Sequence, residues 1–138
     1  MRLWHESLIE VLPRQQLLGQ WRELNSIYKK EDKHILINFI YEYPKKDLLL
    51  YSLKVILTMQ RRGYNINLKN FIDYFQIKDY KEMQKILLSN AKTFVKKMNE
   101  RYLLQCYYNL QEKYDCGGIT EKEWNKINQR FYEITKME

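Results

Sequence analysis

The sequence has little from which disulfides, linkers or membrane segments could form. Its two cysteines, Cys106 and Cys116, are too few and too isolated for a secreted disulfide framework or a zinc site, so we expect a reducing compartment. Four glycines and two prolines leave little material for flexible linkers. Eighteen apolar residues never run together, and Glu6 and Glu10 interrupt the apolar N-terminal residues. These absences predict a soluble, cytoplasmic protein with neither a signal peptide nor a membrane partner.

The composition that is present favours a globular protein with a polyanionic partner. Hydrophobic residues make up 45% of the 138 residues, enough to bury a core without disulfides or a metal. The formal net charge is +7 and aromatic residues make up 14% of the chain, a combination that suits phosphate neutralisation and stacking on bases. Charge alone does not single out nucleic acid, because many lysine-rich proteins are simply basic.

Two prolines and a glycine mark the ends of the first two predicted helices. Pro13 and Pro44 each suit the first turn of a helix, and apolar residues recur at helical spacing after both. Gly63 follows the last apolar turn of the second helix, where glycine commonly ends a helix. The predicted elements are a helix over 13–29, a polar loop over 29–34, an apolar connector over 35–41 and a helix over 44–62.

The second half of the chain predicts a helical hairpin. A short helix over 71–75 is followed by 82–114, which reads as one long helix or two because no strong breaker interrupts it. A turn at 116–118 precedes Thr120 and Glu123, whose spacing is that of a capping box at the start of a last helix. The apolar face of that helix carries Trp124, Ile127, Phe131 and Ile134.

These elements predict an all-α fold with an N-terminal segment threaded toward the first helix. We expect a helical core over 1–90 and a C-terminal hairpin over 91–138, packed on the same domain. In the first helix, Gly19, Arg22 and Glu23 share a polar arc opposite the apolar stripe. A glycine exposed in mid-helix costs about 1 kcal/mol relative to alanine, which indicates close approach of a ligand or another backbone. A merely solvated helix face is the alternative.

The first 66 residues resemble the pyrimidine-dimer DNA glycosylases, the phage endonuclease V type and its bacterial relatives. In that family an arginine follows the catalytic N-terminal residue, and a later helix carries Gln, Leu and then Arg-Glu-Leu. The matching residues here, with one residue of slack before the helix, are Arg2, Gln15, Leu17, Arg22, Glu23 and Leu24.

The resemblance continues beyond the first helix, with departures. Bacterial relatives carry Lys/Asn-His before an apolar segment, then a helix that begins at proline and ends at Arg-Gly-Tyr or Arg-Gly-Phe. The chain has Lys33-His34, Pro44 and Arg62-Gly63-Tyr64 in that order. Gln16 stands where the phage enzyme has a histidine, and Ile35 follows His34 where relatives often have proline. No role of that missing imidazole is carried over.

The resemblance implies a metal-free DNA glycosylase with abasic-site lyase activity and no cofactor. Its implied nucleophile is the α-amine of Met1, and the bulky Arg2 should keep the initiator methionine in place. An α-amine titrates at about 7.7–8.0, so part of it is unprotonated near neutral pH and could form a Schiff base with the sugar. Glu23 is the implied acid/base and electrostatic partner.

The implied substrate is damaged duplex DNA, with pyrimidine dimers first among the candidate lesions. Arg2 and Arg22 would hold phosphates, and Gln15 would contact the strand. His34 has either a DNA-binding or catalytic role or a structural role, as a cap at the end of the loop or as a core residue. Arg62 either extends the phosphate-binding surface or lies on a solvated face. Because a base in a stacked duplex is out of reach, such an enzyme must kink the DNA and extrude a nucleotide. In the family the extruded base is the one opposite the lesion.

Two alternatives remain at this stage. The chain could be a DNA-binding module that kept the fold and lost the chemistry, which a lyase assay would separate from an enzyme. The C-terminal hairpin could instead make it mainly an oligomerisation or docking protein through Phe94, Leu103, Tyr107 and Tyr108. The sequence leaves the oligomeric state open.

Overall fold

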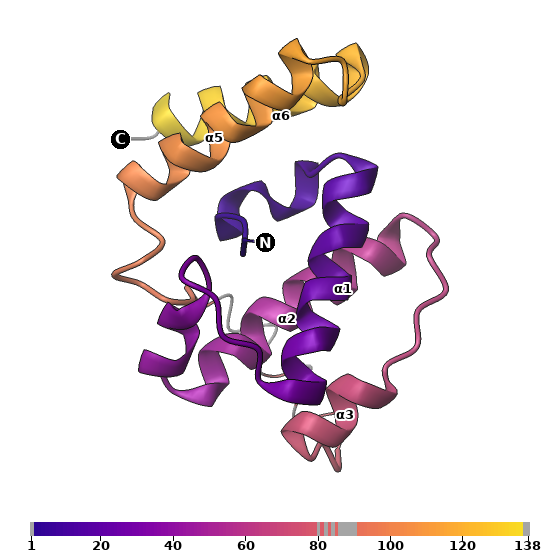
Figure 1. Cartoon of the computed structure of the whole chain (residues 1–138). Coiled ribbons are helices and arrows are strands. Elements are labelled where there is room, and N and C mark those ends of the chain that lie inside the picture. The colour runs from indigo at the N-terminus through magenta and orange to yellow at the C-terminus, as the bar shows by residue number, and fades with distance from the viewer. Residues whose placement is uncertain (1, 80, 82, 84, 86–90, 137–138) are drawn as a thin grey trace.

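The computed structural model describes residues 2–79, 81, 83, 85 and 91–136. Within these residues the fold is all-α, as the sequence predicts, with helices and no strand (Figure 1). In chain order the helices are η1 (Glu6–Val11), α1 (Arg14–Lys30), η2 (Asn38–Glu42), α2 (Lys45–Arg61), α3 (Lys69–Phe75), α5 (Glu100–Asp115) and α6 (Glu121–Lys136). The elements named η are 3-10 helices.

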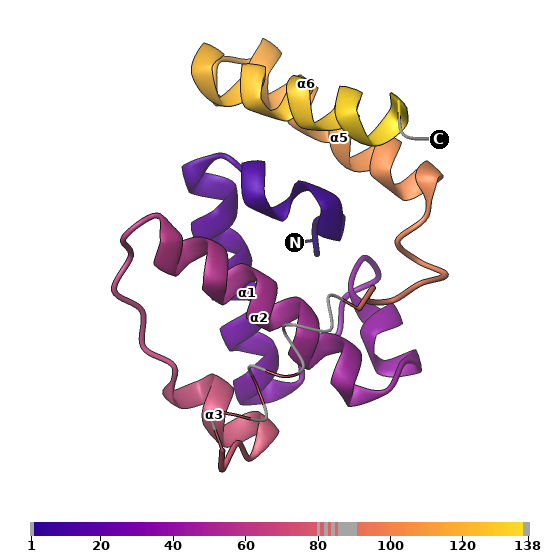
Figure 2. The same ribbon diagram turned by 180° about the vertical axis from the view of Figure 1, so that it is seen from behind.

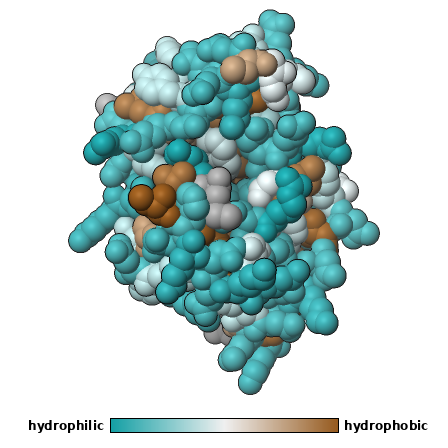
Figure 3. Space-filling view, viewed as in Figure 1, coloured by the Kyte–Doolittle hydropathy of each residue, from teal (hydrophilic) through white to brown (hydrophobic). Residues whose placement is uncertain are grey.

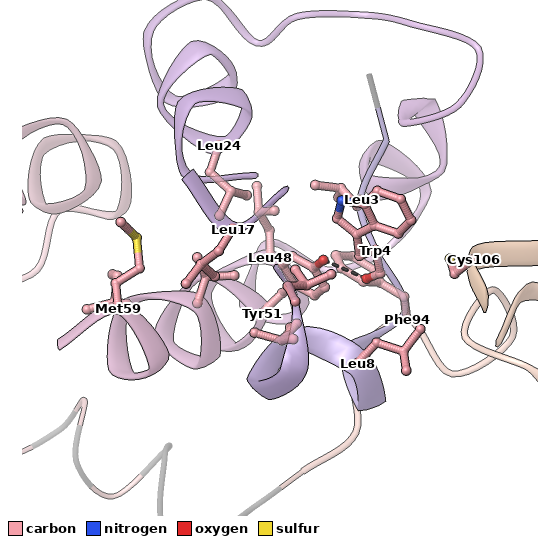
Figure 4. Packing of buried hydrophobic residues seen from close by; sticks show 14 of the residues in the cluster. Leu3, Trp4, Leu8, Leu17, Leu24, Leu48, Tyr51, Met59, Phe94 and Cys106 are labelled. Carbon is pink, nitrogen blue, oxygen red and sulfur yellow. Dashed lines mark hydrogen bonds between the residues drawn. The ribbon is translucent and has the colours of Figure 1, made fainter. Parts of the chain in front are cut away.

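The N-terminal segment lies at the centre of the molecule. In both views it sits between the α5–α6 hairpin and the pair formed by α1 and α2, and η1 packs against both α2 and α6 (Figures 1 and 2). The side chains of Leu3 and Trp4 are buried in the core (Figure 4). The predicted threading of this segment toward α1 is therefore confirmed, although η1 itself was not predicted.

The boundaries of α1 and α2 follow the predicted signals. Pro13 and Pro44 directly precede the two helices, and Gly63 has a positive φ of 86° just after α2. Glu31 ends α1 in the left-handed region with φ 49°, so the loop starts about two residues later than predicted. The expected connector over 35–41 is a turn that leads into η2.

The hairpin turn is confirmed in detail. The Thr120 hydroxyl accepts a hydrogen bond from the Glu123 backbone N–H at 3.1 Å, and the Glu123 carboxylate accepts from the Thr120 backbone N–H at 3.1 Å. These are the two reciprocal bonds of a capping box. Gly117 adopts a positive φ of 84° directly after α5 and its end residue Cys116.

A single helix over 82–114 is wrong, because residues 91–99 are not helical. Buried Phe94 has a positive φ of 47°, and its backbone N–H donates to the Asp47 carboxylate at 3.1 Å. The Thr93 N–H donates to the Glu6 carboxylate at 2.8 Å. These partners, 47 and 87 residues away, replace the helical hydrogen bonds. Residues 82, 84 and 86–90 of the expected helix lie outside the described part.

Candidate functional site

Gln20 of α1 holds the N-terminal backbone in place. Its side chain is 2% exposed, and its amide oxygen accepts from the Trp4 N–H at 2.8 Å while its amide nitrogen donates to the Arg2 carbonyl at 3.2 Å. One side chain thus satisfies a donor and an acceptor of an extended segment, as a neighbouring strand would. The chain leaving Trp4 toward Arg2 is consequently fixed against the middle of α1.

Two buried tyrosines complete this clamp from other helices. The Tyr51 hydroxyl of α2 donates to the Trp4 carbonyl at 2.6 Å and lies 3.0 Å from the Gln20 amide oxygen (Figure 4). The Tyr102 hydroxyl of α5 donates to the Leu3 carbonyl. Burial raises the pKa of both phenols above their ordinary value, so both hydroxyls stay protonated as donors. Three helices therefore determine where the backbone of residues 2–4 lies.

A cleft of about 580 Å³ opens beside this clamped segment. Ligand sites in proteins commonly have volumes of about 300–1,000 Å³. Its walls come from the N-terminal segment, from α1, from the turn after the α1 loop and from α5. The lining residues are Arg2, Trp4, Gln16, Gly19, Gln20, Arg22, Glu23, Leu36, Asn109 and Lys113.

Glu23 is the acidic group of the cleft, and it is partly removed from solvent. Burial raises the pKa of its carboxyl above the ordinary value of 4.5; Asp32 raises it further, and His34 acts in the opposite direction. The Glu23 Oε1 atom is buried and has no hydrogen-bond partner among the described residues. A buried acceptor without a partner costs about 1–3 kcal/mol. Within the described residues, Glu23 thus places a carboxyl oxygen without a hydrogen-bond partner at the cleft.

Gly19 lies one turn of α1 before Glu23 and leaves space in the cleft wall. A Cβ added at this position would lie 3.7 Å from the Nη2 atom of Arg22, which is an ordinary contact. The packing of the protein therefore does not require glycine here, although glycine in mid-helix costs about 1 kcal/mol relative to alanine. Close approach of a ligand to Gly19 stays a prediction.

The cleft carries three cations besides its one carboxyl group. The guanidinium carbon of Arg2 lies 5.9 Å from the Trp4 ring centroid and 6.0 Å from that of Tyr102. Arg22 of α1 and Lys113 of α5 are exposed at the same cleft. An excess of positive charge favours an anionic ligand, and the guanidinium groups can bind phosphate oxygens bidentately.

Of the site residues predicted from the sequence, Arg2, Arg22 and Glu23 line the same cleft. His34 adjoins them in the turn beside the cleft, where its Nδ1 atom accepts from the Leu36 N–H at 3.1 Å, which is the structural role at the end of the loop. His34 also lowers the pKa of the Glu23 carboxyl. A functional role of His34 at the site therefore stays a prediction. Met1 lies outside the described residues and is covalently joined to Arg2.

Gln15 and Arg62 do not line the cleft. Gln15 is exposed on α1, and the adjacent Gln16 lines the cleft instead, with a buried Oε1 atom that has no partner in the described part of the chain. The Arg62 Nη2 atom donates to the Glu10 carbonyl at 2.9 Å and so joins the end of α2 to η1. A DNA contact by either residue stays a prediction.

Sequence reasoning missed two kinds of site residue. Gln20 interrupts the apolar stripe between Leu17 and Leu24, and a buried polar side chain at such a position signals a specific partner. Asn109 and Lys113 gave no local signal, because their place at the cleft depends on how the hairpin packs over the N-terminal segment.

Neither a metal centre nor a membrane helix is found in the part of the chain that the structure describes. Across 2–79, 81, 83, 85 and 91–136, no group of three or more His, Cys, Asp or Glu residues is arranged to hold a metal ion. No helix in the same residues is both long and apolar enough to cross a membrane. Cys106 and Cys116 are free thiols.

Comparison with known proteins identifies the family from the half of the chain that carries most of the cleft. The family model described as pyrimidine dimer DNA glycosylase matches residues 1–71. A search of curated proteins and a search of solved structures gave no significant match. The matched range contains Arg2, Arg22 and Glu23 together with the clamp residues Gln20 and Tyr51. The chain belongs to the pyrimidine dimer DNA glycosylase family.

Proposed function

We propose that this protein excises a damaged base from duplex DNA and then cleaves the strand, using the α-amine of Met1 as its nucleophile. Pyrimidine dimers are the first candidate lesion, in keeping with the family. The reaction is that of a glycosylase with abasic-site lyase activity, and no step calls on a metal or a cofactor.

The clamp on residues 2–4 is the observation that carries the proposal. Four hydrogen bonds from Gln20, Tyr51 and Tyr102 fix this backbone beside a cleft that contains Glu23. Met1 is joined to Arg2 by a peptide bond, and consecutive Cα atoms are about 3.8 Å apart, so the clamp on Arg2 supports a role for the α-amine at the cleft. Such positioning makes an attack on bound DNA effectively unimolecular.

The chemistry begins with attack of the unprotonated amine on the anomeric carbon C1′ of the damaged nucleotide. The glycosidic bond breaks, and the base leaves with the bonding electron pair and takes up a proton. The sugar ring opens as O4′ accepts a proton, which gives an imine between Met1 and C1′. Loss of a proton from C2′ then expels the 3′ phosphate, and water hydrolyses the imine to release the enzyme.

Glu23 has two roles in this proposal. As a carboxylate it stabilises the positive charge that grows on the sugar while the glycosidic bond breaks. With its pKa raised by burial, it is also suited to exchange protons nearer neutral pH than an exposed glutamate. Its Oε1 atom, unpartnered within the described residues, is free to accept a hydrogen bond from a substrate.

Borohydride trapping on lesion-containing duplexes tests the proposal. Borohydride reduces the imine to a stable amine, so native protein should become covalently joined to DNA at its N-terminal residue. Two residues added before Met1 should abolish trapping, whereas the same two residues added at the C-terminal end should not. Trapping at an internal lysine would contradict the role of Met1. Lesion binding without trapping or cleavage would favour a DNA-binding module that lacks the chemistry.

A further inference from the structure

Two aliphatic side chains project from the turn beside the cleft. Ile35 is 86% exposed and Leu36 is 40% exposed, and Leu36 also lines the cleft. The visible face of the molecule is mostly hydrophilic, with small and separate hydrophobic patches (Figure 3). Among the described residues, the other large exposed apolar side chains are those of Val95, Tyr108 and Tyr132, and none of these three lines the cleft. Leu36 therefore combines solvent exposure with a place at the site.

The turn that carries these side chains is held rigidly. The Ile37 N–H donates to the His34 carbonyl at 2.9 Å, and the His34 N–H donates to the Asn38 side chain at 2.7 Å. The Leu36 N–H donates to the His34 imidazole at 3.1 Å. Ile37 is fully buried and anchors the turn in the core. Because the turn is already ordered, inserting its tip into a partner costs little conformational entropy.

The charges around the turn identify duplex DNA as the partner. Lys33 is exposed just before the turn, and Arg2, Arg22 and Lys113 are at the cleft that Leu36 lines. Two aliphatic side chains form too small an apolar patch for a stable protein interface, which commonly buries about 800 Å² on each partner. A short apolar projection among cations suits a base stack flanked by phosphates, since DNA-bending proteins insert Leu or Ile between base steps.

We infer that Ile35 and Leu36 form a wedge that enters the base stack beside the damaged nucleotide. The wedge occupies the space from which the extruded nucleotide leaves, and it kinks the duplex so that the backbone approaches Arg2 and Arg22. Apolar contacts of the wedge offset the free-energy cost of unstacking a base step. The inference rests on the proposed function, because it assigns the extrusion step of that reaction to this turn.

Serine substitutions at the two positions test the wedge. The variants are Ile35→Ser, Leu36→Ser and the double change, with Val95→Ser as the matched control because Val95 is 64% exposed and does not line the cleft. The probe is a duplex with a thymine dimer and 2-aminopurine opposite it, whose fluorescence rises when the base unstacks. Single-turnover cleavage of the same duplex is measured in parallel, and circular dichroism checks the helix content.

The double variant should lose most of the fluorescence rise and at least about tenfold in cleavage rate, with Val95→Ser unchanged. A duplex that lacks the base opposite the dimer should restore much of the lost rate, since less stacking then has to be broken. Normal fluorescence and cleavage by the double variant would overturn the wedge and leave the proposed function standing. Absence of cleavage and trapping by the native protein would overturn the proposed function, and the fluorescence would still report on the wedge. No unstacking by the native protein would overturn the wedge as well.

Discussion

The matched region 1–71 and the C-terminal hairpin each contain a glutamate with a shifted pKa, and the two shifts have opposite directions. Glu23, in the matched region, is half-buried with one carboxyl oxygen unpartnered among the described residues, and burial raises its pKa. Burial alone would also raise the pKa of Glu123 in α6, yet hydrogen bonds from the Arg14 N–H and from Thr120 hold it below its ordinary value. Glu123 thereby caps both its own helix and the start of α1.

This difference between Glu23 and Glu123 distinguishes a residue at the cleft from a residue that stabilises helix ends. At the turn between α5 and α6, the capping box and the positive φ of Gly117 follow the local rules for caps and turns, as expected where stability is the main demand. At the cleft, the Glu23 and Gln16 side-chain oxygens have no hydrogen-bond partner among the described residues, and a glycine lies within a helix; each of these features costs stability. Such local violations are expected where a protein gives up stability for function.

Glu23→Gln should have the largest effect, which is a loss of strand-cleavage activity. The change keeps the size of the side chain but removes its charge, and loss of a general acid/base commonly lowers the rate by about 10²-fold to 10⁴-fold. Affinity for lesion DNA should hold or rise, because a carboxylate facing phosphates is removed. Strand cleavage and equilibrium binding would be measured on one dimer-containing duplex. Glu42→Gln, at an exposed position outside the cleft, is the control. Near-normal cleavage by folded Glu23→Gln protein would end the catalytic assignment.

Gln20→Leu should have the next largest effect, because it removes the side chain that holds the backbone of residues 2–4 against α1. The substitution leaves the Trp4 N–H and the Arg2 carbonyl without their partner, and each unsatisfied buried group costs about 1–3 kcal/mol. The free energy of unfolding, from denaturant titration, should fall accordingly, and borohydride trapping should slow in the folded protein. The exposed Gln15→Leu on the same helix should stay within about 0.5 kcal/mol of the native protein. Equal stability of the two variants would show that the clamp has little energetic weight.

Lys113→Ala tests whether the hairpin takes part in binding. If Lys113 neutralises one phosphate, the slope of log affinity against log salt should become shallower by about 0.9. Lys126→Ala, exposed on α6 and outside the cleft lining, is the control and should leave that slope unchanged. A slope that Lys113→Ala does not change would restrict DNA binding to the matched region.

The smallest expected effect is an opposite dependence of stability on pH in two variants. The pKa of Glu23 is raised in the folded protein. The ionised carboxylate therefore lowers the free energy of unfolding, whereas the protonated carboxyl group does not. Glu23→Gln should therefore stabilise the protein at neutral pH, and the gain should vanish as the pH falls below the ordinary value of 4.5. Glu123 has a lowered pKa, so its contribution is present above that value and is lost as the pH falls through the folded pKa.

Glu123→Gln should accordingly destabilise the protein at neutral pH, with the difference disappearing in acid. Melting temperatures at a series of pH values measure both variants. A shift of the same sign in the two would contradict the contrast between the two glutamates.

Much of the fold could be predicted from local sequence signals. Pro13 and Pro44 mark the starts of α1 and α2, Gly63 marks the end of α2, and Thr120 with Glu123 marks the start of α6. These signals work because a cap or a turn is made by residues a few positions apart. The placement of Arg22 and Glu23 on one polar arc follows in the same way from the period of the helix.

The sequence by itself thus determined the all-α class, the starts of α1, α2 and α6, the polar arc of α1 and the resemblance to the family. The tertiary structure decided the rest. Residues 91–99 leave the helical pattern because Phe94 and Thr93 find partners far away in the chain, and the cleft gains Lys113 only when the hairpin folds over the N-terminal segment. The Tyr102 bond to Leu3 spans 99 residues. Local sequence patterns do not predict such contacts, because the contacts contribute to stability only once the distant segments have packed together.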